Sequence, residues 1–402
     1  MIHLASFISK YVTLRPKSLF EEEINIHKEK LSKKICNKSV LVIGGAGSIG
    51  SSFIKAILPF KPASLVVADI NENALAELTR DLRSIREISM PDTYIPYPLD
   101  YASDTFEKMF ISNKGFDIIA NFSAHKLVRS EKDIFSVEAM LKNNVLHAKK
   151  LLDLLAKYPP EEYFCVSTDK AANPVNIMGA SKRIMEDLIF SYSDKFPVKT
   201  ARFANVAFSN GSLPAGFLSR IEKQQPISAP LDVRRYFVSP EESGQICMLA
   251  CMLGKNREIF FPKLDETQMK TFDEIAVKLL EEYGYKVIRC TSDKEAMDKA
   301  EALKAGNRDY PVIFSLSDTT GEKPYEEFYT DMESTDQNRF HSLGVVIGKD
   351  KPDGEKLETL LNDLEAEFNK YGTSKEKIVE IMKSYLPEFG HIETGKSLDS
   401  KM

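Results

Sequence analysis

Residues 39–58, SVLVIGGAGSIGSSFIKAIL, decide the fold of this chain. The run SVLVIG is short, rich in β-branched residues and ends in glycine, a pattern typical of a buried parallel strand. The segment SSFIKAIL favours a helix, so GGAGSIG joins a strand to a helix. Glycines at such a turn let the backbone approach a pyrophosphate, and the helix that follows offers unpaired N–H groups. The stretch predicts a dinucleotide-binding turn, with a tight strand–helix turn that binds nothing as the alternative.

The same alternation of strand and helix continues along the chain. Further strands are predicted at 64–69, 116–122, 162–167 and 198–203, and helices at 71–82, 145–158 and 177–190. Asn71 is placed to cap the first of these helices. Strands that alternate with helices in this way predict an α/β protein with a doubly wound parallel sheet.

The chain divides into four predicted segments. Residues 1–38 are a charged leader, in which apolar residues predict amphipathic helical pieces: Leu19, Phe20, Ile24, Leu31 and Ile35. Residues 39–205 hold the alternating pattern. Over 206–350, glycines and prolines predict loops and short elements, which suits a smaller substrate-binding α/β part with some segments that return to the sheet. Apolar residues at helical spacing predict a helical C-terminal extension over 351–402.

Composition and charge exclude several classes of protein. The net charge of −5 provides no basic field for nucleic acid or an anionic membrane. No apolar run approaches the ~18 residues of a membrane-spanning helix. The chain begins without an export signal, so we expect mature sequence and a cytoplasmic location. Five cysteines without CxxC spacing indicate free thiols, and Cys247 and Cys251 favour helical burial over metal binding, so no metal is expected.

The second predicted strand ends in an acidic residue, Asp69. A carboxylate at this place binds the hydroxyls of an adenosine ribose and repels a 2′-phosphate, so NAD is favoured over NADP. An ordinary acid near a helix cap is the alternative. The predicted cofactor contacts in this region are Gly44, Gly47, Ser48, Ile49, Gly50 and Asp69.

The segment STDKAANPVNIMGASKR, residues 167–183, begins where the strand at 162–167 ends. Thr168, Asp169 and Lys170 stand in a row at the place where doubly wound folds bind their ligands. A capping Thr-Asp pair beside a solvated lysine is the alternative. On the helix that follows, Met178 and Lys182 are four residues apart and share a face. A thioether cannot transfer a proton, and its ordinary use is to fill a core.

These motifs, together with SAHKLV, RFANV and GEKPYEEF, resemble the extended short-chain dehydrogenase/reductases, and among them the UDP-N-acetylglucosamine 4,6-dehydratases of polysaccharide biosynthesis. The resemblance covers roughly residues 15–345. One branch of that family has tyrosine at the place of Met178, and this chain resembles the other branch, which has methionine, without its membrane segments. Two departures affect the substrate: Asp318-Thr319-Thr320 precede GEK where relatives have arginine and proline, and VRSEKD follows SAHKL.

The resemblance implies an NAD-binding Rossmann fold and a hydro-lyase reaction with tightly bound NAD. Hydride leaves C4 of the sugar to give a 4-ketone, water leaves across C5 and C6, and hydride returns to C6. The implied product is a 4-keto-6-deoxy sugar nucleotide for surface polysaccharide or glycan synthesis. A UDP-sugar substrate, most simply UDP-N-acetylglucosamine with retained C5 configuration, and a homo-oligomer are also implied.

The resemblance also assigns roles to single residues. It implies that Asp169 protonates the leaving 6-hydroxyl, that Lys170 takes H5, and that Thr168 fills the Ser/Thr position of the catalytic triad. Lys182 is implied to hold the nicotinamide ribose, and Asn144 to tie the central helix to the active-site strand. The catalytic set is thus Thr168, Asp169, Lys170, Met178 and Lys182; further cofactor contacts are Asp100, Tyr101 and Ala124; substrate contacts are His125, Lys126, Asn205, Arg235 (or Arg234) and Glu322.

The role of base makes a demand on Lys170. An ordinary lysine, with a pKa near 10.4, is neutral in only about 0.04% of molecules at pH 7. Burial and a positive nicotinamide favour the neutral amine, whereas an ionised Asp169 opposes it. We therefore expect the pair to act with Asp169 protonated and Lys170 neutral. Because Met178 leaves the C4 hydroxyl without a tyrosinate, Thr168 or an ordered water is expected to relay that proton.

Two other functions are compatible with the sequence. A nucleotide-sugar C4 or C5 epimerase, or a configuration-inverting dehydratase, would share the fold. A C4 epimerase needs the hydride step alone and leaves Asp169 and Lys170 without a task. The second alternative is a non-catalytic dinucleotide-binding module, in which Met178 marks a lost activity.

Overall fold

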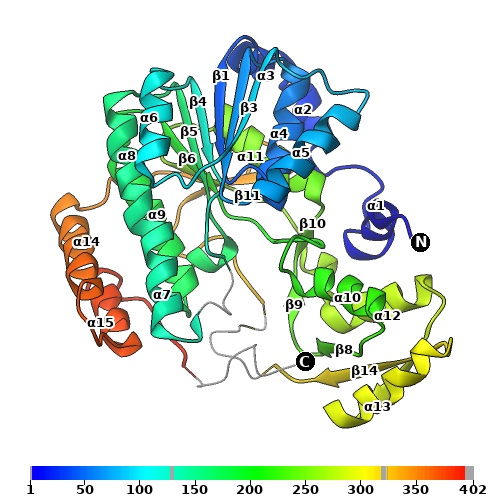
Figure 1. Ribbon diagram of the computed structural model, residues 1–402. Helices are drawn as coiled ribbons and strands as arrows, with labels where there is room; N and C mark the ends of the chain where they lie inside the picture. Colours follow the sequence, from blue (N-terminus) through cyan, green and yellow to red (C-terminus); the bar gives the residue numbers. More distant parts are fainter. Residues whose placement is uncertain (1, 127–130, 318–322, 324, 394–402) are drawn as a thin grey trace.

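A nine-stranded sheet forms the centre of the part of the chain that the structure describes (Figure 1). This computed structural model describes residues 2–126, 131–317, 323 and 325–393. The strand order is β15-β16-β11-β6-β5-β4-β1-β2-β3. The bounds are β1 Ser39–Ile43, β2 Ser64–Asp69, β3 Thr93–Pro98, β4 Ile118–Asn121, β5 Glu162–Val166, β6 Val198–Ala201, β11 Glu258–Pro262, β15 Thr335–Asp336 and β16 Leu343–Val346. Strands β1 to β6 and β11 are parallel and β16 is antiparallel to β11, so the predicted doubly wound parallel sheet is confirmed.

The edge strand β3 is absent from the strands that the sequence predicted. Its residues, TYIPYP, include Pro96 and Pro98, which cannot donate hydrogen bonds to a neighbouring strand. Proline is tolerated at the edge of a sheet, where one side of the strand has no partner. β3 pairs with β2 alone and ends the sheet, which explains how a proline-rich segment forms a strand here.

Helices cover both faces of the sheet. Helices α4, α5 and α11 lie on one face, and α6, α8 and α9 lie on the other (Figure 1). The bounds are α4 Ser48–Ile57, α5 Glu72–Ser84, α6 Asp104–Ser112, α7 Ile134–Leu141, α8 His147–Lys157, α9 Ile177–Ser191 and α11 Pro240–Leu253. Asn71 caps α5 as predicted, because its side chain accepts a hydrogen bond from the N–H of Ala74 at 3.0 Å. Cys247 and Cys251 are buried within α11, as their spacing predicted.

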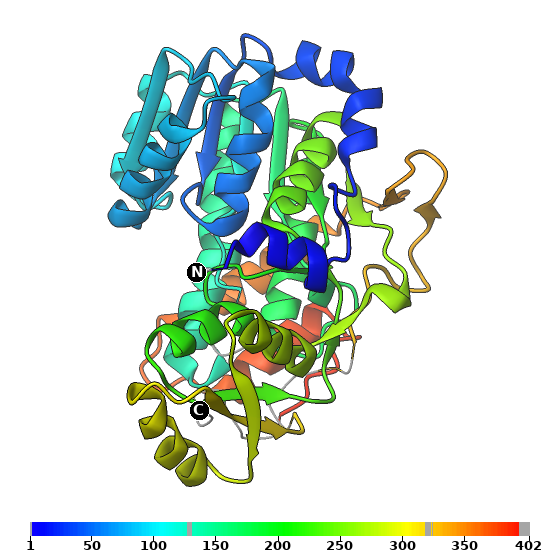
Figure 2. The same cartoon turned by 90° about the vertical axis from the view of Figure 1, so that its right-hand side faces the viewer.

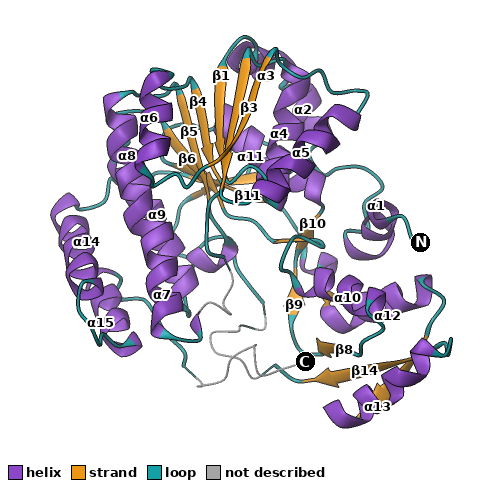
Figure 3. Ribbon diagram, viewed as in Figure 1, coloured by secondary structure: helices purple, strands orange, loops and turns teal. Residues whose placement is uncertain are grey.

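A smaller part lies next to the sheet and has its own hydrophobic core (Figure 2). It contains α10 Leu213–Glu222, α12 Phe272–Glu282, α13 Asp293–Lys304 and the parallel sheet β13 Lys286–Cys290, β14 Asp309–Ser315 and β8 Ile227–Pro230, visible in Figure 3. Two short strand pairs, β7 Asn205–Val206 with β10 Phe237–Val238 and β9 Arg234–Arg235 with β12 Lys270–Thr271, complete it. Regular structure is more extensive here than the glycines and prolines predicted, because Phe217, Leu279 and Tyr310 bury a common core.

Both ends of the described chain pack against this frame. The leader forms α1 Leu4–Phe7, α2 Glu21–Ile26 and α3 Lys28–Ile35, and Phe20, Leu31 and Ile35 are buried in the main core. The C-terminal helices α14 Gly354–Phe368 and α15 Lys375–Tyr385 pack together beside α7 and α9 (Figure 1). Among the described residues, no helix combines the length and the apolar character needed to cross a membrane.

Candidate active site

The turn after β1 has the geometry of a phosphate cradle. Gly44 has a left-handed backbone, with φ of +70°, and a Cβ there would lie 2.6 Å from the backbone nitrogen of Ser123. A Cβ on Gly50 would lie 2.4 Å from the carbonyl oxygen of Gly44, so glycine is required for α4 to start this close to the turn. Gly47 precedes α4 and offers no side-chain cap, which leaves N–H groups of the first turn available to a ligand. This turn fits a dinucleotide pyrophosphate.

Asp69 is held beside this turn at the end of β2. Its Oδ2 accepts a hydrogen bond from the N–H of Ala46 at 3.0 Å, and its Oδ1 accepts one from the N–H of Asn71 at 2.9 Å. Tyr101 lies after β3, and its hydroxyl donates to the carbonyl oxygen of Asn143 at 2.5 Å. Burial raises the pKa of Tyr101 well above its ordinary value, so the phenol forms a wall of the site rather than an acid or base.

One cleft, with a volume of about 1270 Å³, extends from the phosphate turn to the smaller part. Every predicted site residue that the structure describes lines this cleft: Gly44, Gly47, Ser48, Ile49, Gly50, Asp69, Asp100, Tyr101, Ala124, His125, Lys126, Thr168, Asp169, Lys170, Met178, Lys182, Asn205 and Arg235. Glu322 lies outside the described residues. The volume exceeds the roughly 300–1,000 Å³ typical of a small-molecule pocket, so two large ligands can share this cleft.

A hydroxyl, a carboxylate and an amine meet where β5 ends. Thr168 Oγ1 donates a hydrogen bond to Oδ1 of Asp169 at 2.8 Å. The Nζ of Lys170 lies 3.2 Å from the same oxygen atom. Asp169 is buried, whereas Thr168 and Lys170 are half-buried. Because the three groups are joined through one oxygen atom, a proton can pass among them without a large movement.

Helix α9 places Met178 and Lys182 in the cleft on one helix face. Lys182 is 4% exposed, and burial lowers the pKa of its amine. The Nζ of Lys182 lies 3.2 Å from the Sδ of Met185. Met178 is 2% exposed. Its side chain has no ionisable group, so it cannot accept a proton as a tyrosine at this position could.

Asn144 joins three elements around the site. It lies in the π-helical turn Lys142–Leu146, between α7 and α8. Its side chain accepts a hydrogen bond from the N–H of His125 and donates one to the carbonyl oxygen of His125, both at 2.9 Å. It also donates to Oγ of Ser181 on α9 at 3.0 Å. Asn144 thus ties this helical turn to the segment after β4 and to α9, whereas the resemblance implied a tie to the active-site strand.

The sequence did not indicate Glu326, a charged residue that contacts the site. Its Oε1 lies 3.5 Å from the Nζ of Lys170 and 4.0 Å from Nη2 of Arg235. Burial raises the pKa of Glu326, and the nearby charge of Lys170 acts in the opposite direction. In the run YEEF, Tyr325 and Glu327 are exposed while Glu326 and Phe328 are buried. The sequence itself has two adjacent glutamates here and does not distinguish the buried one from the exposed one.

Two arginines line the cleft near the smaller part. The guanidinium of Arg235 is buried, and Nη1 donates to the carbonyl oxygens of Arg234 at 2.8 Å and Lys323 at 3.0 Å. Arg234 is exposed and does not line the cleft, so the structure favours Arg235 of the two. Arg220 on α10, which the sequence analysis did not select, also lines the cleft.

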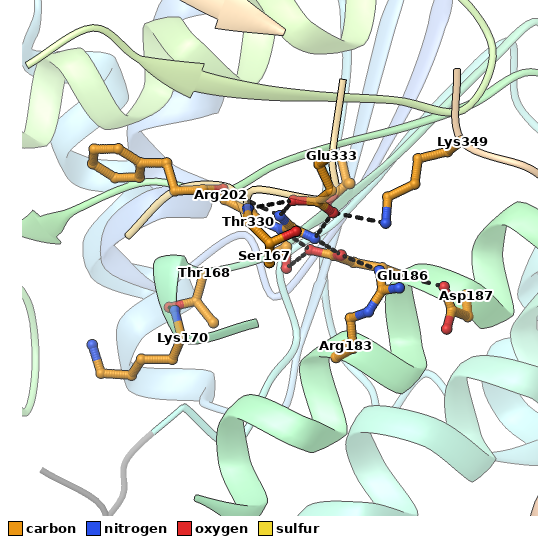
Figure 4. Close-up of polar contacts among 12 residues, drawn as sticks. Ser167, Thr168, Lys170, Arg183, Glu186, Asp187, Arg202, Thr330, Glu333 and Lys349 are labelled. Carbon is orange, nitrogen blue, oxygen red and sulfur yellow. Dashed lines mark hydrogen bonds and ion pairs between the residues drawn. The ribbon is translucent and has the colours of Figure 1, made fainter. Parts of the chain in front are cut away.

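A buried ion-pair network lies beside Thr168 and Lys170 (Figure 4). Arg202, after β6, binds Glu186 of α9 through Nε at 2.8 Å and Nη2 at 2.6 Å. It binds Glu333 through Nη1 at 2.7 Å and Nη2 at 3.0 Å. Glu186 also accepts a hydrogen bond from Oγ of Ser167 at 2.6 Å, and Ser167 directly precedes Thr168 in the chain. Burial raises the pKa of Glu333, but its hydrogen bonds and ion pair with Arg202 lower it to about 2.

Comparison with known proteins gives a family match and several relatives. Residues 40–346 match a family described as polysaccharide biosynthesis protein. The chain is 29% identical, over 92% of its length and the whole of the relative, to an uncharacterised membrane protein of Methanocaldococcus jannaschii. It is 26% identical, over 77% of its length, to the probable polysaccharide biosynthesis protein EpsC of Bacillus subtilis, but spans 50% of that protein. It is 23% identical to an inverting UDP-N-acetylglucosamine 4,6-dehydratase of Campylobacter jejuni, over 73% of this chain and 82% of that enzyme.

Solved structures share the fold. Pen from Bacillus thuringiensis superposes with a TM-score of 0.63 at 20% identity, over 82% of this chain and 98% of that one. The dTDP-glucose 4,6-dehydratase DesIV from Streptomyces venezuelae, solved with NAD, gives a TM-score of 0.54 at 18% identity, over 89% of this chain and 99% of that one.

A sequence relative, a UDP-glucose 4-epimerase of Rickettsia prowazekii, is 26% identical over 62% of this chain and 72% of its own length. Dehydratases and epimerases are thus both similar to this chain.

Proposed function

Since this chain belongs to the polysaccharide biosynthesis protein family of extended short-chain dehydrogenase/reductases, we propose that it is an NAD-dependent UDP-N-acetylhexosamine 4,6-dehydratase, a hydro-lyase. The observation that supports this most is the meeting of Thr168, Asp169 and Lys170 at one carboxylate oxygen inside the cleft. An elimination needs both a base and an acid, and these groups supply them. We take UDP-N-acetylglucosamine as the substrate. We place the reaction in the cytoplasm, in a homo-oligomer that supplies surface polysaccharide or glycan synthesis.

NAD fits the part of the cleft around the phosphate turn. The glycines at 44 and 50 allow the turn to pack tightly against the backbone of Ser123 and Gly44, and the first turn of α4 offers N–H groups to a pyrophosphate. The carboxylate of Asp69 suits ribose hydroxyls and repels a 2′-phosphate, which favours NAD over NADP. Lys182 would hold the nicotinamide ribose. When bound, NAD supplies the hydride acceptor for C4 and the hydride donor for C6.

Thr168 transfers the first proton. The C4 hydroxyl must lose its proton as its carbon loses hydride, and Met178 has no group to accept it. Thr168 Oγ1 accepts this proton while it gives its own to Oδ1 of Asp169, to which it is already hydrogen-bonded at 2.8 Å. Asp169 thereby becomes a carboxylic acid, which is the state that the next step requires.

Lys170 and Asp169 then remove water. The 4-ketone makes H5 acidic, and the neutral amine of Lys170 takes H5. The electron pair of the C5–H bond forms the C5=C6 double bond as the C6–O bond breaks. Asp169 gives its proton to the leaving hydroxyl and returns to a carboxylate. The water that leaves therefore contains the proton first lost by the C4 hydroxyl.

Lys170 also completes the reaction at C5. As hydride returns to C6, the ammonium of Lys170 gives a proton back to C5. Because one amine removes and returns this proton from the same face of the sugar, C5 keeps its configuration. A configuration-inverting dehydratase, as the C. jejuni relative is named, would need a donor on the opposite face.

A C4 epimerase is the second candidate, favoured by the similarity to UDP-glucose 4-epimerases. That reaction removes and returns a hydride at C4 and needs no elimination. Asp169 and Lys170, which lie 3.2 Å apart at the cleft, would then have no task. A non-catalytic dinucleotide-binding module would likewise leave the cluster unused, so we rank both below the dehydratase.

Product analysis tests the reaction class. We expect that the purified protein, incubated with UDP-N-acetylglucosamine in deuterium oxide and followed by proton NMR, removes the C6 hydroxymethyl signals. A new methyl signal should replace them. A galacto-configured product with an intact hydroxymethyl group would indicate an epimerase instead. An unchanged spectrum would contradict the proposal for this sugar.

A further inference from the structure

A second carboxylate faces Lys170 from outside the turn that follows β5. Oε1 of Glu326 lies 3.5 Å from Nζ of Lys170. The same Nζ lies 3.2 Å from Oδ1 of Asp169. Glu326 is 5% exposed, so the protein rather than water surrounds its carboxyl group. The next residue, Glu327, is exposed and accepts a hydrogen bond from the side chain of Asn173 at 2.8 Å. Of these two adjacent glutamates, Glu326 contacts Lys170, whereas Glu327 contacts Asn173 at the surface.

Two arginines hold the segment that contains Glu326. Nη1 of Arg202, in the network of Figure 4, donates to the carbonyl oxygen of Phe328 at 3.1 Å. On the other side, Nη1 of Arg235 donates to the carbonyl oxygen of Lys323 at 3.0 Å. Hydrogen bonds therefore hold a backbone carbonyl group on either side of Glu326, at Lys323 and at Phe328.

The proposed elimination requires a place for one further proton. Next to an ionised carboxylate, Lys170 rests as an ammonium, and an ammonium cannot take H5. Asp169 cannot accept the ammonium proton at this stage, because it has just received the proton of the C4 hydroxyl. A second acceptor must therefore lie within reach of Nζ, and Glu326 meets this requirement.

We propose that Glu326 is a positioning residue for Lys170. Glu326 holds the amine of Lys170 in place and stores its proton while the amine takes H5. This inference rests on the proposed dehydratase function. Before the elimination, the N–H bond of the ammonium breaks and its proton passes to Oε1 of Glu326, which leaves a neutral amine and a neutral acid. After Lys170 has returned its proton to C5, Glu326 gives the stored proton back to the amine. The three groups end the turnover in the protonation states in which they began it.

The charges that face Glu326 suit this exchange. They are Lys170, Asp169, Arg235 and Lys323. Burial raises the pKa of Glu326, Asp169 adds to that rise, and the three cations act against it. When Lys170 gives up its charge, one of the opposing cations is lost. The stored proton is then held more firmly until the amine is charged again.

The substitution Glu326→Gln, with Glu327→Gln as the matched control, tests the inference. In the unmodified protein, methyl formation should be nearly constant with pH around neutrality, because the ammonium proton has an internal acceptor. In E326Q the amine must release its proton to water. We expect methyl formation to fall roughly 100-fold at pH 7 and to recover by about tenfold for each unit of rising pH. E327Q should keep the rate and the flat pH profile.

Reduction of the bound cofactor, read from its near-ultraviolet absorbance, separates this inference from the proposed function. E326Q should still reduce the cofactor when substrate is added, which shows that the variant folds, binds sugar and oxidises C4. If the unmodified protein forms no methyl group, the proposed function fails. If the unmodified protein forms the methyl group, the rates of the variants decide. If E326Q forms it as fast as E327Q, or more slowly by the same factor at every pH, Glu326 stores no proton and the inference fails. Glu326→Asp keeps a carboxyl group and should restore the flat profile at a lower rate; a steep profile in this variant would also contradict the inference.

Discussion

Replacing Lys170 with methionine should reduce the rate of methyl formation about 1,000-fold, the scale of a lost general base. The substitution keeps most of the length of the side chain and removes the amine proposed to take H5. Oxidation at C4 does not use this amine, so addition of UDP-N-acetylglucosamine should still reduce the bound cofactor. Stopped-flow absorbance would follow the reduction, and proton NMR would follow the methyl group in the same sample.

A lysine outside the cleft provides the control for this substitution. Lys157 ends α8 and is exposed, so Lys157→Met should leave both rates unchanged. Methyl formation by K170M within tenfold of the unmodified protein would show that another group takes H5. Loss of cofactor reduction together with loss of the methyl group would place Lys170 in the first step instead of the second.

Replacing Arg202 with methionine should lower the free energy of unfolding by about 3–5 kcal/mol, because removal of one partner leaves buried charges without compensation. Arg202 and Glu186 have fully buried side chains, and Glu333 is 7% exposed. Urea unfolding, followed by circular dichroism, measures the change. The exposed pair of Arg80 and Glu77, 3.3 Å apart, is the control, and Arg80→Met should give no measurable change. An R202M variant as stable as R80M would contradict the importance of the network.

The effect of Arg202→Met should depend on pH. The pKa of Glu333 is lowered to about 2, and the pKa of Glu186 is also lowered, because Arg202 outweighs the effect of burial. A carboxyl group whose pKa is lowered by folding stabilises the folded state at pH values above its unfolded-state pKa of about 4.5. This stabilisation is lost as the pH falls through the pKa of the folded state. Without Arg202, both carboxyls take up protons at higher pH. The difference between R202M and the unmodified protein should therefore be largest at neutral pH and narrow in acid.

Local patterns were sufficient to predict most of the frame of the molecule, and the family resemblance implied many of the residues that line its cleft. The strand at 64–69 has the predicted bounds, and Asn71 forms the predicted cap. Thr168, Asp169 and Lys170 come together because they are neighbours in the chain and follow a strand whose carboxyl end faces the cleft. Signals of this kind lie within a few residues of each other, and short-range stereochemistry fixes them.

The parts that the sequence did not predict depend on contacts between distant residues. Arg202 and Glu333 are 131 positions apart, and no local pattern links them. Glu326 and Lys170 are 156 positions apart, and the sequence does not link them either. The strand β3 forms from a proline-rich segment because it lies at an edge, which is a property of the whole sheet. Each of these required the tertiary structure.

In the proposed reaction, this protein moves hydride within one sugar, from C4 to C6, while water leaves. UDP-N-acetylglucosamine that is deuterated at C4 tests it most directly, with NMR and mass analysis of the product. We predict a 4-keto-6-deoxy product whose C6 methyl group contains the deuterium. Deuterium retained at C4 of an epimerised sugar, or a methyl group without deuterium, would contradict the claim.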